Sequence, residues 1–350
     1  MKSEQDILAA LGRIASIPRV RLFTGTTPLE TMPNLTKHCG GAELFVKRDD
    51  CTELAFGGNK VRQLEYYLAA AMAEKADTIL ITGAVQSNFV RSAAAGARKL
   101  GMTCHIQLEG RVATKAVRYH DSGNVLIDKL LGATIHTYAH GEDEAGADAN
   151  LEMIAEELRD QGRRPYIIHL APGHPPLGAL GYVVAAQELL QQIADGKFFV
   201  DEIFVASGSG ATHAGLLFGL RAFGSPIRVT GSCVRREITE QRERISDTCD
   251  GISELLETTL RITDDDISLT DDFLAPGYGR INEATSEAII LGARTEALML
   301  DPVYTGKAMA AMIHHASLAN EGSGFVFLHT GGTPAIFAYQ EDIESALTTD

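Results

Sequence analysis

A glycine-rich segment from Ser207 to Thr212 is the first candidate for chemistry in this sequence. It follows an apolar run that predicts a strand and precedes an apolar stretch that predicts a helix. Glycines let a ligand approach the backbone, and the free amides at a helix start bind anions together with serine and threonine hydroxyls. The spacing matches neither the Walker loop nor the dinucleotide-binding fingerprint. The segment therefore predicts a phosphate site, and a strand-to-helix turn without a ligand is the alternative.

Lys60 is the second candidate. It follows Gly57 and Gly58 and stands at the start of a predicted helix that continues through Leu64 and Leu68. The positive end of the helix dipole and burial both disfavour the ammonium form, so the amine becomes a better nucleophile. This position predicts Schiff-base chemistry with a carbonyl group, and an ordinary exposed lysine is the alternative.

The loop from Gly83 to Arg91 again joins a predicted strand to a predicted helix. Ser87 or Asn88 can cap that helix. Both also lie where strands end and helices begin, which is where ligands bind in open α/β sheets. Two further loops, at 301–307 and 329–334, have the same kind of position in the sequence.

The elements that must position these loops alternate along the chain from Thr78 onward. Short runs rich in β-branched residues are separated by longer segments with helical spacing, which predicts an α/β fold with parallel sheets covered by helices on both faces. The predicted strands are 78–82, 103–108, 134–138, 166–170, 202–206, 227–232 and 324–329, and the clearest predicted helices are 88–100, 144–161, 177–193, 212–223 and 282–297.

Composition limits the function classes. The 350 residues include 31 Lys and Arg against 46 Asp and Glu, and this net charge of −15 disfavours nucleic acid and anionic membranes as partners. The apolar runs are much shorter than the roughly 20 residues that span a bilayer. The first six residues lack the pattern of a secretory signal, so we expect a cytoplasmic protein. The five cysteines are widely spaced, and neither a disulfide framework nor a metal site is expected.

Several motifs occur in order along nearly the whole chain from about Arg19 and resemble those of the 1-aminocyclopropane-1-carboxylate (ACC) deaminase and D-cysteine desulfhydrase family. The resemblance implies a pyridoxal-phosphate enzyme of the tryptophan-synthase-β-like fold, fold type II, with two doubly wound parallel-sheet domains. The motifs are Lys-Arg-Asp-Asp at 47–50, Gly-Gly-Asn-Lys at 57–60, Gln-Ser-Asn at 86–88, Gly-Ala-Leu-Gly-Tyr at 178–182, the glycine-rich loop, Ala-Pro-Gly-Tyr-Gly at 275–279, Asp-Pro-Val-Tyr-Thr-Gly-Lys-Ala-Met at 301–309 and His-Thr-Gly-Gly at 329–332.

The same resemblance implies a set of cofactor contacts. Lys60 would hold pyridoxal 5'-phosphate covalently and, once displaced by the substrate, would act as the base at Cα. Asn88 would bond the ring hydroxyl. Thr330, with Thr305 nearby, would face the pyridine nitrogen. The phosphate would be bound by Ser207, Gly208, Ser209, Gly210, Ala211 and Thr212.

The resemblance also implies the catalytic and substrate-binding residues. The catalytic set comprises Lys60, Ser87, Tyr278 and Tyr304, which surround the substrate carboxylate and the reacting carbons. The substrate-binding set comprises Ser87, Asn88, Phe89, His174 and Tyr278.

The Pro- and Gly-rich stretch at 171–176 cannot continue a helix or a central strand, and it predicts a junction between two blocks of alternating elements. We predict a large cofactor-binding domain from residues 1–55 and 170–350 and a small domain from residues 56–169, with the active-site cleft between them. A homodimer or another homo-oligomer is expected from the resemblance.

Three positions bear on the substrate. Thr305 stands where ring-opening deaminases of this family have glutamate, which favours β-elimination. Phe89 and the loop at 171–176 differ from what desulfhydrases of the family usually have beside the substrate. We therefore expect L-cysteate as substrate, with sulfite as the leaving group and His174 and loop amides as its donors. The alternatives are D-cysteine with release of sulfide, a ring-opening deaminase, and a non-catalytic pyridoxal-phosphate-binding protein.

Overall fold

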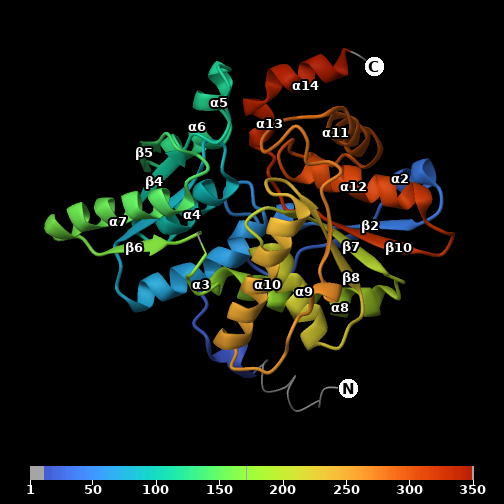
Figure 1. Cartoon of the computed structure of the whole chain (residues 1–350), viewed down its shortest axis with the longest axis horizontal. Helices are drawn as coiled ribbons and strands as arrows, with labels where there is room; N and C mark the ends of the chain where they lie inside the picture. Colours follow the sequence, from blue (N-terminus) through green and yellow to red (C-terminus); the bar gives the residue numbers. More distant parts are fainter. Residues whose placement is uncertain (1–11, 171, 349–350) are drawn as a thin grey trace.

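The computed structural model describes residues 12–170 and 172–348. Their strands form two sheets, one of six strands in the order β1-β2-β10-β7-β8-β9 and one of four strands in the order β5-β4-β3-β6. Figure 1 shows the two sheets in different halves of the molecule, each with helices packed around it. The acidic N-terminal segment and Ala171, at the start of the Pro- and Gly-rich loop, lie outside the described residues.

The six-stranded sheet is parallel except for the antiparallel β1–β2 pair at its edge. Side chains alternate between its two faces, as they must in a strand. On β7, Ile203 and Val205 pack in one core with α8 and α9, whereas Phe204 packs in another core with α12. Both faces are therefore covered by helices. The strands are β1 (Leu29–Thr31), β2 (Glu43–Lys47), β7 (Glu202–Ser207), β8 (Arg228–Cys233), β9 (Ser268–Thr270) and β10 (Gly324–Leu328).

The four-stranded sheet is parallel throughout. Its central strand β3 is buried along its whole length. Ile79 and Ile81 face the core formed with α3 and α4, and Leu80 faces the smaller core formed with α7. This sheet too is covered on both faces. The strands are β3 (Thr78–Ala84), β4 (Thr103–Glu109), β5 (Thr134–Tyr138) and β6 (Pro165–Ile168).

The helices follow the strands in the alternation that the sequence predicts. The α-helices are α2 (Pro33–Cys39), α3 (Asn59–Ala73), α4 (Asn88–Lys99), α5 (Val117–Asp121), α6 (Asn124–Leu130), α7 (Glu144–Asp160), α8 (Leu180–Gly196), α9 (Ala211–Ala222), α10 (Ile238–Leu255), α11 (Glu283–Glu296), α12 (Thr305–Leu318), α13 (Ala335–Ala338) and α14 (Gln340–Leu347). Short 3₁₀ turns cover Asp49–Cys51, Leu177–Ala179 and Asp264–Asp266.

The predicted α/β class is confirmed, and each of the seven predicted strands is present with its ends shifted by a few residues at most. The sequence analysis missed β1, β2 and β9. β1 and β9 have three residues each, too few to produce a period of two. β2 lies before the region where strands and helices alternate, and its place in the sheet depends on pairing with β10, near the other end of the chain.

The division into a large and a small domain stays a prediction. The strands of the four-stranded sheet all lie between residues 78 and 168. Helix α3 packs against α4 on one side and α8 on the other. It therefore lies between the two sheets, and its first turn carries Lys60.

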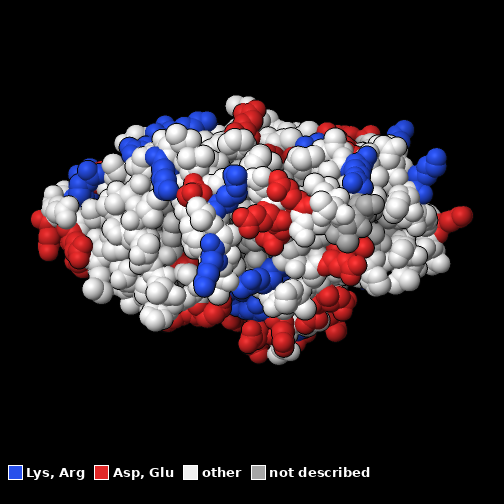
Figure 2. Space-filling model, turned by 90° about the horizontal axis from the view of Figure 1, so that it is seen from above, with Lys and Arg blue, Asp and Glu red and all other residues white. Residues whose placement is uncertain are grey.

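None of the described helices is long and apolar enough to cross a bilayer. On the face shown in Figure 2, acidic and basic side chains are interspersed over both halves of the molecule. The expected cytoplasmic location and homo-oligomer stay predictions.

Candidate active site

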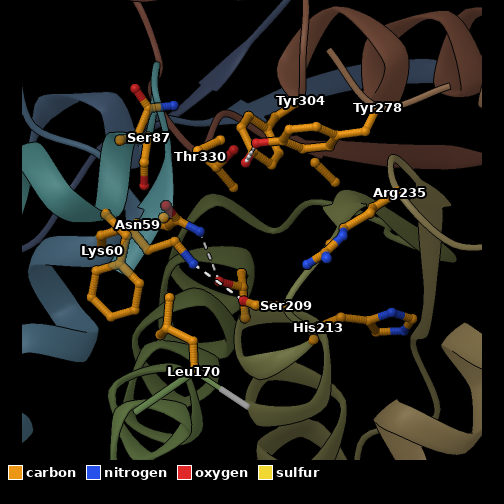
Figure 3. Close-up of a pocket in the computed structure, with 18 of the residues that line it drawn as sticks. Asn59, Lys60, Ser87, Leu170, Ser209, His213, Arg235, Tyr278, Tyr304 and Thr330 are labelled. Carbon is orange, nitrogen blue, oxygen red and sulfur yellow. Dashed lines mark hydrogen bonds between the residues drawn. The ribbon is translucent and has the colours of Figure 1, made fainter. Parts of the chain in front are cut away.

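A cavity opens at the carboxyl ends of β3 and β7, where α3, α4 and α9 begin. Ligands bind at this edge of parallel sheets because strands end there and helix amides point there. Figure 3 shows how side chains from distant parts of the sequence converge on the cavity. It is lined by Asn59, Lys60, Gly83, Ala84, Ser87, Asn88, Phe89, Arg111, Glu144, Leu170, Ala206, Gly208, Ser209, Gly210, Thr212, His213, Arg235, Arg244, Tyr278, Tyr304 and Thr330.

Lys60 is the second residue of α3, and its side chain reaches into the cavity (Figure 3). Its Nζ lies 3.4 Å from Ser209 Oγ and 3.5 Å from Gln63 Oε1, and it is 4.8 Å from the centre of the Phe89 ring. Burial lowers the pKa of Lys60 to about 8, and among the described residues no carboxylate opposes this shift. A substantial fraction of the amine is therefore neutral, and nucleophilic, near neutral pH.

Two glycines with positive φ bring Lys60 to this position. Gly57 has φ 61° and Gly58 has φ 114°. A Cβ on Gly57 would lie 2.1 Å from the carbonyl oxygen of Asp50, and one on Gly58 would lie 3.0 Å from that of Thr330. The Asn59 amide then donates to the Thr330 carbonyl over 3.1 Å. Only glycine permits this close approach. It holds the start of α3 against the loop that carries Thr330.

The glycine-rich loop contributes four of its six predicted residues to the cavity: Gly208, Ser209, Gly210 and Thr212. Ser207 Oγ is instead buried against His213 Nδ1 at 3.1 Å and accepts a hydrogen bond from Gln241 Nε2 over 2.9 Å. The remaining member, Ala211, lines a neighbouring groove rather than the cavity. The Ser207 hydroxyl is therefore hydrogen-bonded to His213 and Gln241 and does not line the cavity.

The first residues of α4 place the loop at 86–89 on the opposite wall. Ser87 caps the helix, since its Oγ accepts from the Val90 amide over 3.3 Å. Asn88 Oδ1 accepts from Asn124 Nδ2 over 2.9 Å. Ser87, Asn88 and Phe89 all line the cavity, so the structure brings together this predicted group with Lys60.

Tyr278 and Tyr304 form a pair at the far side of the cavity from α3 (Figure 3). Their hydroxyl oxygens are 2.6 Å apart, and their rings meet edge to face. Burial raises the pKa of both phenols, and the positive charge of Arg111 opposes that rise. Both phenols therefore stay protonated at neutral pH and can donate a proton or a hydrogen bond.

The two predicted threonines differ. Thr330 lines the cavity. Thr305 is fully buried at the start of α12, where its Oγ1 donates to Asp301 Oδ1 over 2.7 Å and accepts from the Asp301 amide over 2.6 Å. Asp301 also accepts from the amide of Tyr304. In this structure Thr305 thus holds the turn that positions Tyr304, and it does not reach the cavity.

His174 also lies outside the cavity, in the neighbouring groove. Its ring stacks on His169 with the centres 3.7 Å apart and the planes at 3°, and both rings approach Asp148 Oδ2. The three side chains could hold a metal ion by distance. However, parallel stacked rings do not aim their in-plane lone pairs at one point, so the arrangement is not a preformed metal site.

The sequence analysis missed four charged residues on the cavity wall: Arg111, Glu144, Arg235 and Arg244. Arg235 follows the predicted strand at 227–232 by three residues, so a charged group at a strand end was the available signal. Glu144 stands at the first position of α7, where an acidic side chain interacts favourably with the helix dipole. Because this role is common, the sequence offered no reason to assign Glu144 to the cavity.

The comparisons with known proteins agree with this geometry. The family described as "Pyridoxal-phosphate dependent enzyme" matches residues 20–331. A D-cysteine desulfhydrase of Salmonella choleraesuis (strain SC-B67) is 42% identical over 335 residues, which cover 95% of this chain and 99% of the relative. The chain belongs to the pyridoxal-phosphate-dependent enzymes, in the ACC deaminase and D-cysteine desulfhydrase family.

Solved structures give the same fold. An ACC deaminase homologue superposes with a TM-score of 0.85 at 33% identity and covers 97% of this enzyme and 99% of its own chain. The processed form of threonine deaminase isoform 2 from Solanum lycopersicum superposes with a TM-score of 0.67 at 16% identity, covering 100% of this enzyme and 90% of its own chain. The enzyme therefore has the predicted fold type II.

The cavity of this enzyme fits pyridoxal phosphate. Gly210 has φ 95° and gives α9 no side-chain cap, so the first amides of that helix can bind a phosphate. Gly208 lines the cavity without a side chain, and a Cβ there would lie 3.1 Å from Val234 Cγ2. The Lys60 amine reaches Ser209 of the same loop. One cavity thus offers the amine and the anion cradle that an aldehyde carrying a phosphate requires.

Proposed function

We propose that this enzyme is a carbon–sulfur lyase that converts D-cysteine and water into pyruvate, ammonium and hydrogen sulfide. The observation that supports it most is the desolvated Lys60 amine, which faces a protonated tyrosine pair across one cavity. The D-cysteine desulfhydrase relative, similar along nearly the full length of both chains, supports the choice of substrate.

The chain's own residues have complementary tasks in this proposal. When bound, pyridoxal phosphate supplies an electron sink that stabilises negative charge at the substrate Cα. Lys60 would hold the cofactor and accept the Cα proton on its neutral amine. The first amides of α4, next to Ser87 and Asn88, would bind the substrate carboxylate. Asn88 and Thr330 would contact the cofactor ring.

The tyrosine pair would protonate the leaving group. Because burial keeps Tyr278 and Tyr304 protonated, a phenol can donate its hydrogen to the sulfur as the bond to Cβ breaks. The short hydrogen bond between the hydroxyls lets one phenol stabilise charge that develops on the other. Elimination breaks the Cα–H and Cβ–S bonds, and one water molecule completes the stoichiometry without any oxidant.

A product assay tests the proposal. The purified enzyme is incubated separately with D-cysteine, L-cysteine and L-cysteate, and sulfide, sulfite and pyruvate are measured. We expect sulfide and pyruvate in equal amounts from D-cysteine, and loss of this activity in Lys60→Ala. Failure to release sulfide from D-cysteine would overturn the substrate assignment.

L-cysteate remains the second candidate, for one reason visible in the cavity. Three arginines, Arg111, Arg235 and Arg244, line its wall, and guanidinium groups are the donors that a sulfonate would need. The donors first expected for that group, His174 and its loop, lie in the neighbouring groove. Release of sulfite from L-cysteate in the same assay would support this substrate.

A further inference from the structure

The turn at 53–58, which leads into α3 and so to Lys60, has a disfavoured backbone conformation. Not only its two glycines but also three residues with side chains have positive φ there: Glu53 at 63°, Ala55 at 44° and Phe56 at 69°. In this region the Cβ of an L-residue crowds the backbone, so each of the three costs conformational free energy. Such a turn persists only where contacts with the rest of the molecule hold it.

The side chain of Arg91 makes contacts of this kind. Its Nη2 donates to the Gly57 carbonyl over 3.1 Å, and its Nη1 donates to the Ala55 carbonyl. Arg91 belongs to α4, which packs against α3. At the base of the turn, Thr52 Oγ1 accepts from the Gly58 amide over 2.8 Å. Thr52 thus closes the turn from within, and Arg91 fixes two of its carbonyls from a different element.

Arg91 carries a charge in the interior without a bonded carboxylate. It is fully buried, and burial lowers its pKa to about 10, so it stays charged at neutral pH. The charge of Asp128 on α6 opposes this shift, but Arg91 Nε and both Asp128 oxygens have no hydrogen-bond partner among the described residues. An apolar side chain would usually serve packing better at such a place. The guanidinium is therefore explained by its bonds to the turn.

Arg91 also belongs to the helix that forms one wall of the cavity. It lies one helical turn beyond Ser87 and Asn88, which line the cavity where α4 begins. The two carbonyls that it binds stand three and five positions before Lys60. One side chain thus joins the start of α4, whose amides would bind the substrate carboxylate, to the segment that carries the amine.

We propose that Arg91 is a positioning residue for Lys60. By binding the Ala55 and Gly57 carbonyls, it keeps the turn in its disfavoured conformation and fixes the Lys60 amine relative to the first amides of α4. Arg91 does not line the cavity, so it acts through the turn and contacts neither substrate nor cofactor. Its effect on proton transfer rests on the proposed carbon–sulfur lyase function, whereas its effect on the buried amine does not.

Covalent capture of pyridoxal phosphate tests the effect on the amine without turnover. The capture rate of the full-length, cofactor-free protein is measured against pH in the wild type and in Arg91→Met. Burial alone lowers the pKa of Lys60, and the charge of Arg91 has no part in it, so a changed midpoint reports the position of the amine. In Arg91→Met we expect the midpoint to rise from about 8 by about one pH unit or more, toward the 10.5 of an exposed lysine.

A second arginine of α4 provides the matched control. Arg98 also donates to two backbone carbonyls, those of Leu131 and Gly132, but that turn does not lead to Lys60. Arg98→Met should therefore leave the midpoint at the wild-type value. Arg91→Lys keeps the buried cation but loses the fork that bonds both carbonyls, so its midpoint should be intermediate. This variant decides the matter if Arg91→Met does not fold.

A substitution in the turn tests whether Arg91 acts through the backbone conformation. Phe56 is 62% exposed, and glycine at this position adopts positive φ without strain. Phe56→Gly should leave the midpoint of the wild type unchanged and should recover part of the shift in Arg91→Met. Absence of any recovery would show that Arg91 does not act through the turn.

Steady-state kinetics of the holoenzyme with D-cysteine test the effect on proton transfer. Because a misplacement of about 1 Å can lower a rate about a hundredfold, Arg91→Met should lower kcat about tenfold to a hundredfold. KM should change less than about threefold. A rise in KM with kcat unchanged would assign Arg91 to substrate binding instead.

Two outcomes of the capture experiment overturn the proposal. One is an unchanged midpoint in both Arg91 variants, and the other is an equal shift in Arg98→Met, which would indicate general loosening of α4. The proposed function fails separately, through absence of sulfide from D-cysteine with the wild-type enzyme, because capture of the cofactor needs no turnover.

Discussion

Two clusters of charge, one buried and one at the cavity, are built differently. The buried cluster joins Lys47, Asp49, Arg62 and Glu188 beneath α3, with two positive and two negative charges. The cleft cluster, at the cavity, places Arg235, Arg236 and Arg244 around Glu144, and Arg235 also pairs with the exposed Glu142. One is balanced, and the other has an excess of positive charge.

The two clusters also differ in how completely their polar groups are hydrogen-bonded. In the buried cluster, Arg62 binds both oxygens of Asp49 and both of Glu188, and Tyr182 donates to Asp49. In the cleft cluster, Arg235 Nε has no described partner. Charges removed from water must be paired in full, because each unpaired one costs several kcal/mol. The cleft cluster lies beside the cavity, where water or a bound anion would offset its excess of positive charge.

The two clusters also act on different parts of the molecule. The buried cluster ties the first turn of α3, and so Lys60, to β2 and α8. The cleft cluster ties the first residue of α7, which packs on the four-stranded sheet, to the region after β8 of the other sheet. We infer that the first cluster serves stability and that the second serves ligand binding across the cleft.

The largest effect is expected from Arg62→Met. This change leaves Asp49 and Glu188 with only Lys47 as a buried cation, and it should lower the free energy of unfolding by about 3–5 kcal/mol. Urea unfolding followed by circular dichroism measures the loss. A loss below about 1 kcal/mol, the scale of an exposed pair, would remove the contrast between the clusters.

The second prediction concerns Lys60, which forms no ion pair with either cluster among the described residues. Each cluster pairs its own carboxylates with arginines, so burial alone sets the pKa of Lys60 at about 8. At pH 7 the amine is then neutral in about one molecule in ten, against about one in 3000 for a pKa of 10.5.

Because the neutral amine reacts, covalent capture of pyridoxal phosphate by the cofactor-free protein should accelerate as the pH rises through 8 and level off above it. Stopped-flow absorbance measures this rate, and Lys60→Ala provides the baseline. A rate that keeps rising to pH 10 would show that the amine is not desolvated.

A smaller effect is expected from Glu144→Gln. Removing the carboxylate frees three arginines, so the affinity for 3-sulfopropanoate, an analogue of L-cysteate that lacks the amine, should rise about twofold to fivefold, as expected for a partly exposed ion pair. Titration calorimetry measures the gain. Glu142→Gln is the matched control, since Glu142 is 72% exposed and pairs with Arg235 alone at the rim, and it should change the affinity less. A fall in affinity for Glu144→Gln would contradict the assigned role.

The smallest effect is expected from Glu156→Gln on α7. This residue pairs with Arg159 at the surface, where both side chains are exposed, and its loss should change the free energy of unfolding by less than about 0.5 kcal/mol. Urea unfolding beside Arg62→Met provides the comparison. A larger change would mean that exposure is a poor guide to the strength of ion pairs in this molecule.

Local patterns explain what could be predicted. Residues adjacent in sequence form both the strand–loop–helix pattern around 207–212 and the glycines before Lys60. The sequence therefore predicts these elements and their place at one edge of a sheet. The motif order then indicates the family. Phe89 and Thr330 were expected at the cavity on the same grounds, and the structure brings them there.

Thr305 and His174 illustrate the opposite case. Both lie in segments that the sequence analysis placed at the active site. However, Thr305 is hydrogen-bonded to Asp301 and His174 pairs with Asp148, so neither side chain lines the cavity. A motif specifies which residue is present, whereas its rotamer depends on neighbours that the motif does not include.

By itself the sequence determined the α/β class, the family, the cofactor and the amine that would bind it, because these depend on short-range periodicity and on motifs of adjacent residues. Only the tertiary structure decided how the charges are paired. Arg235 and Glu144 are 91 positions apart, and Arg62 and Glu188 are 126 apart. Which carboxylate meets which arginine depends on the packing of the two sheets around α3, and this packing buries Arg235 Nε without a hydrogen-bond partner among the described residues.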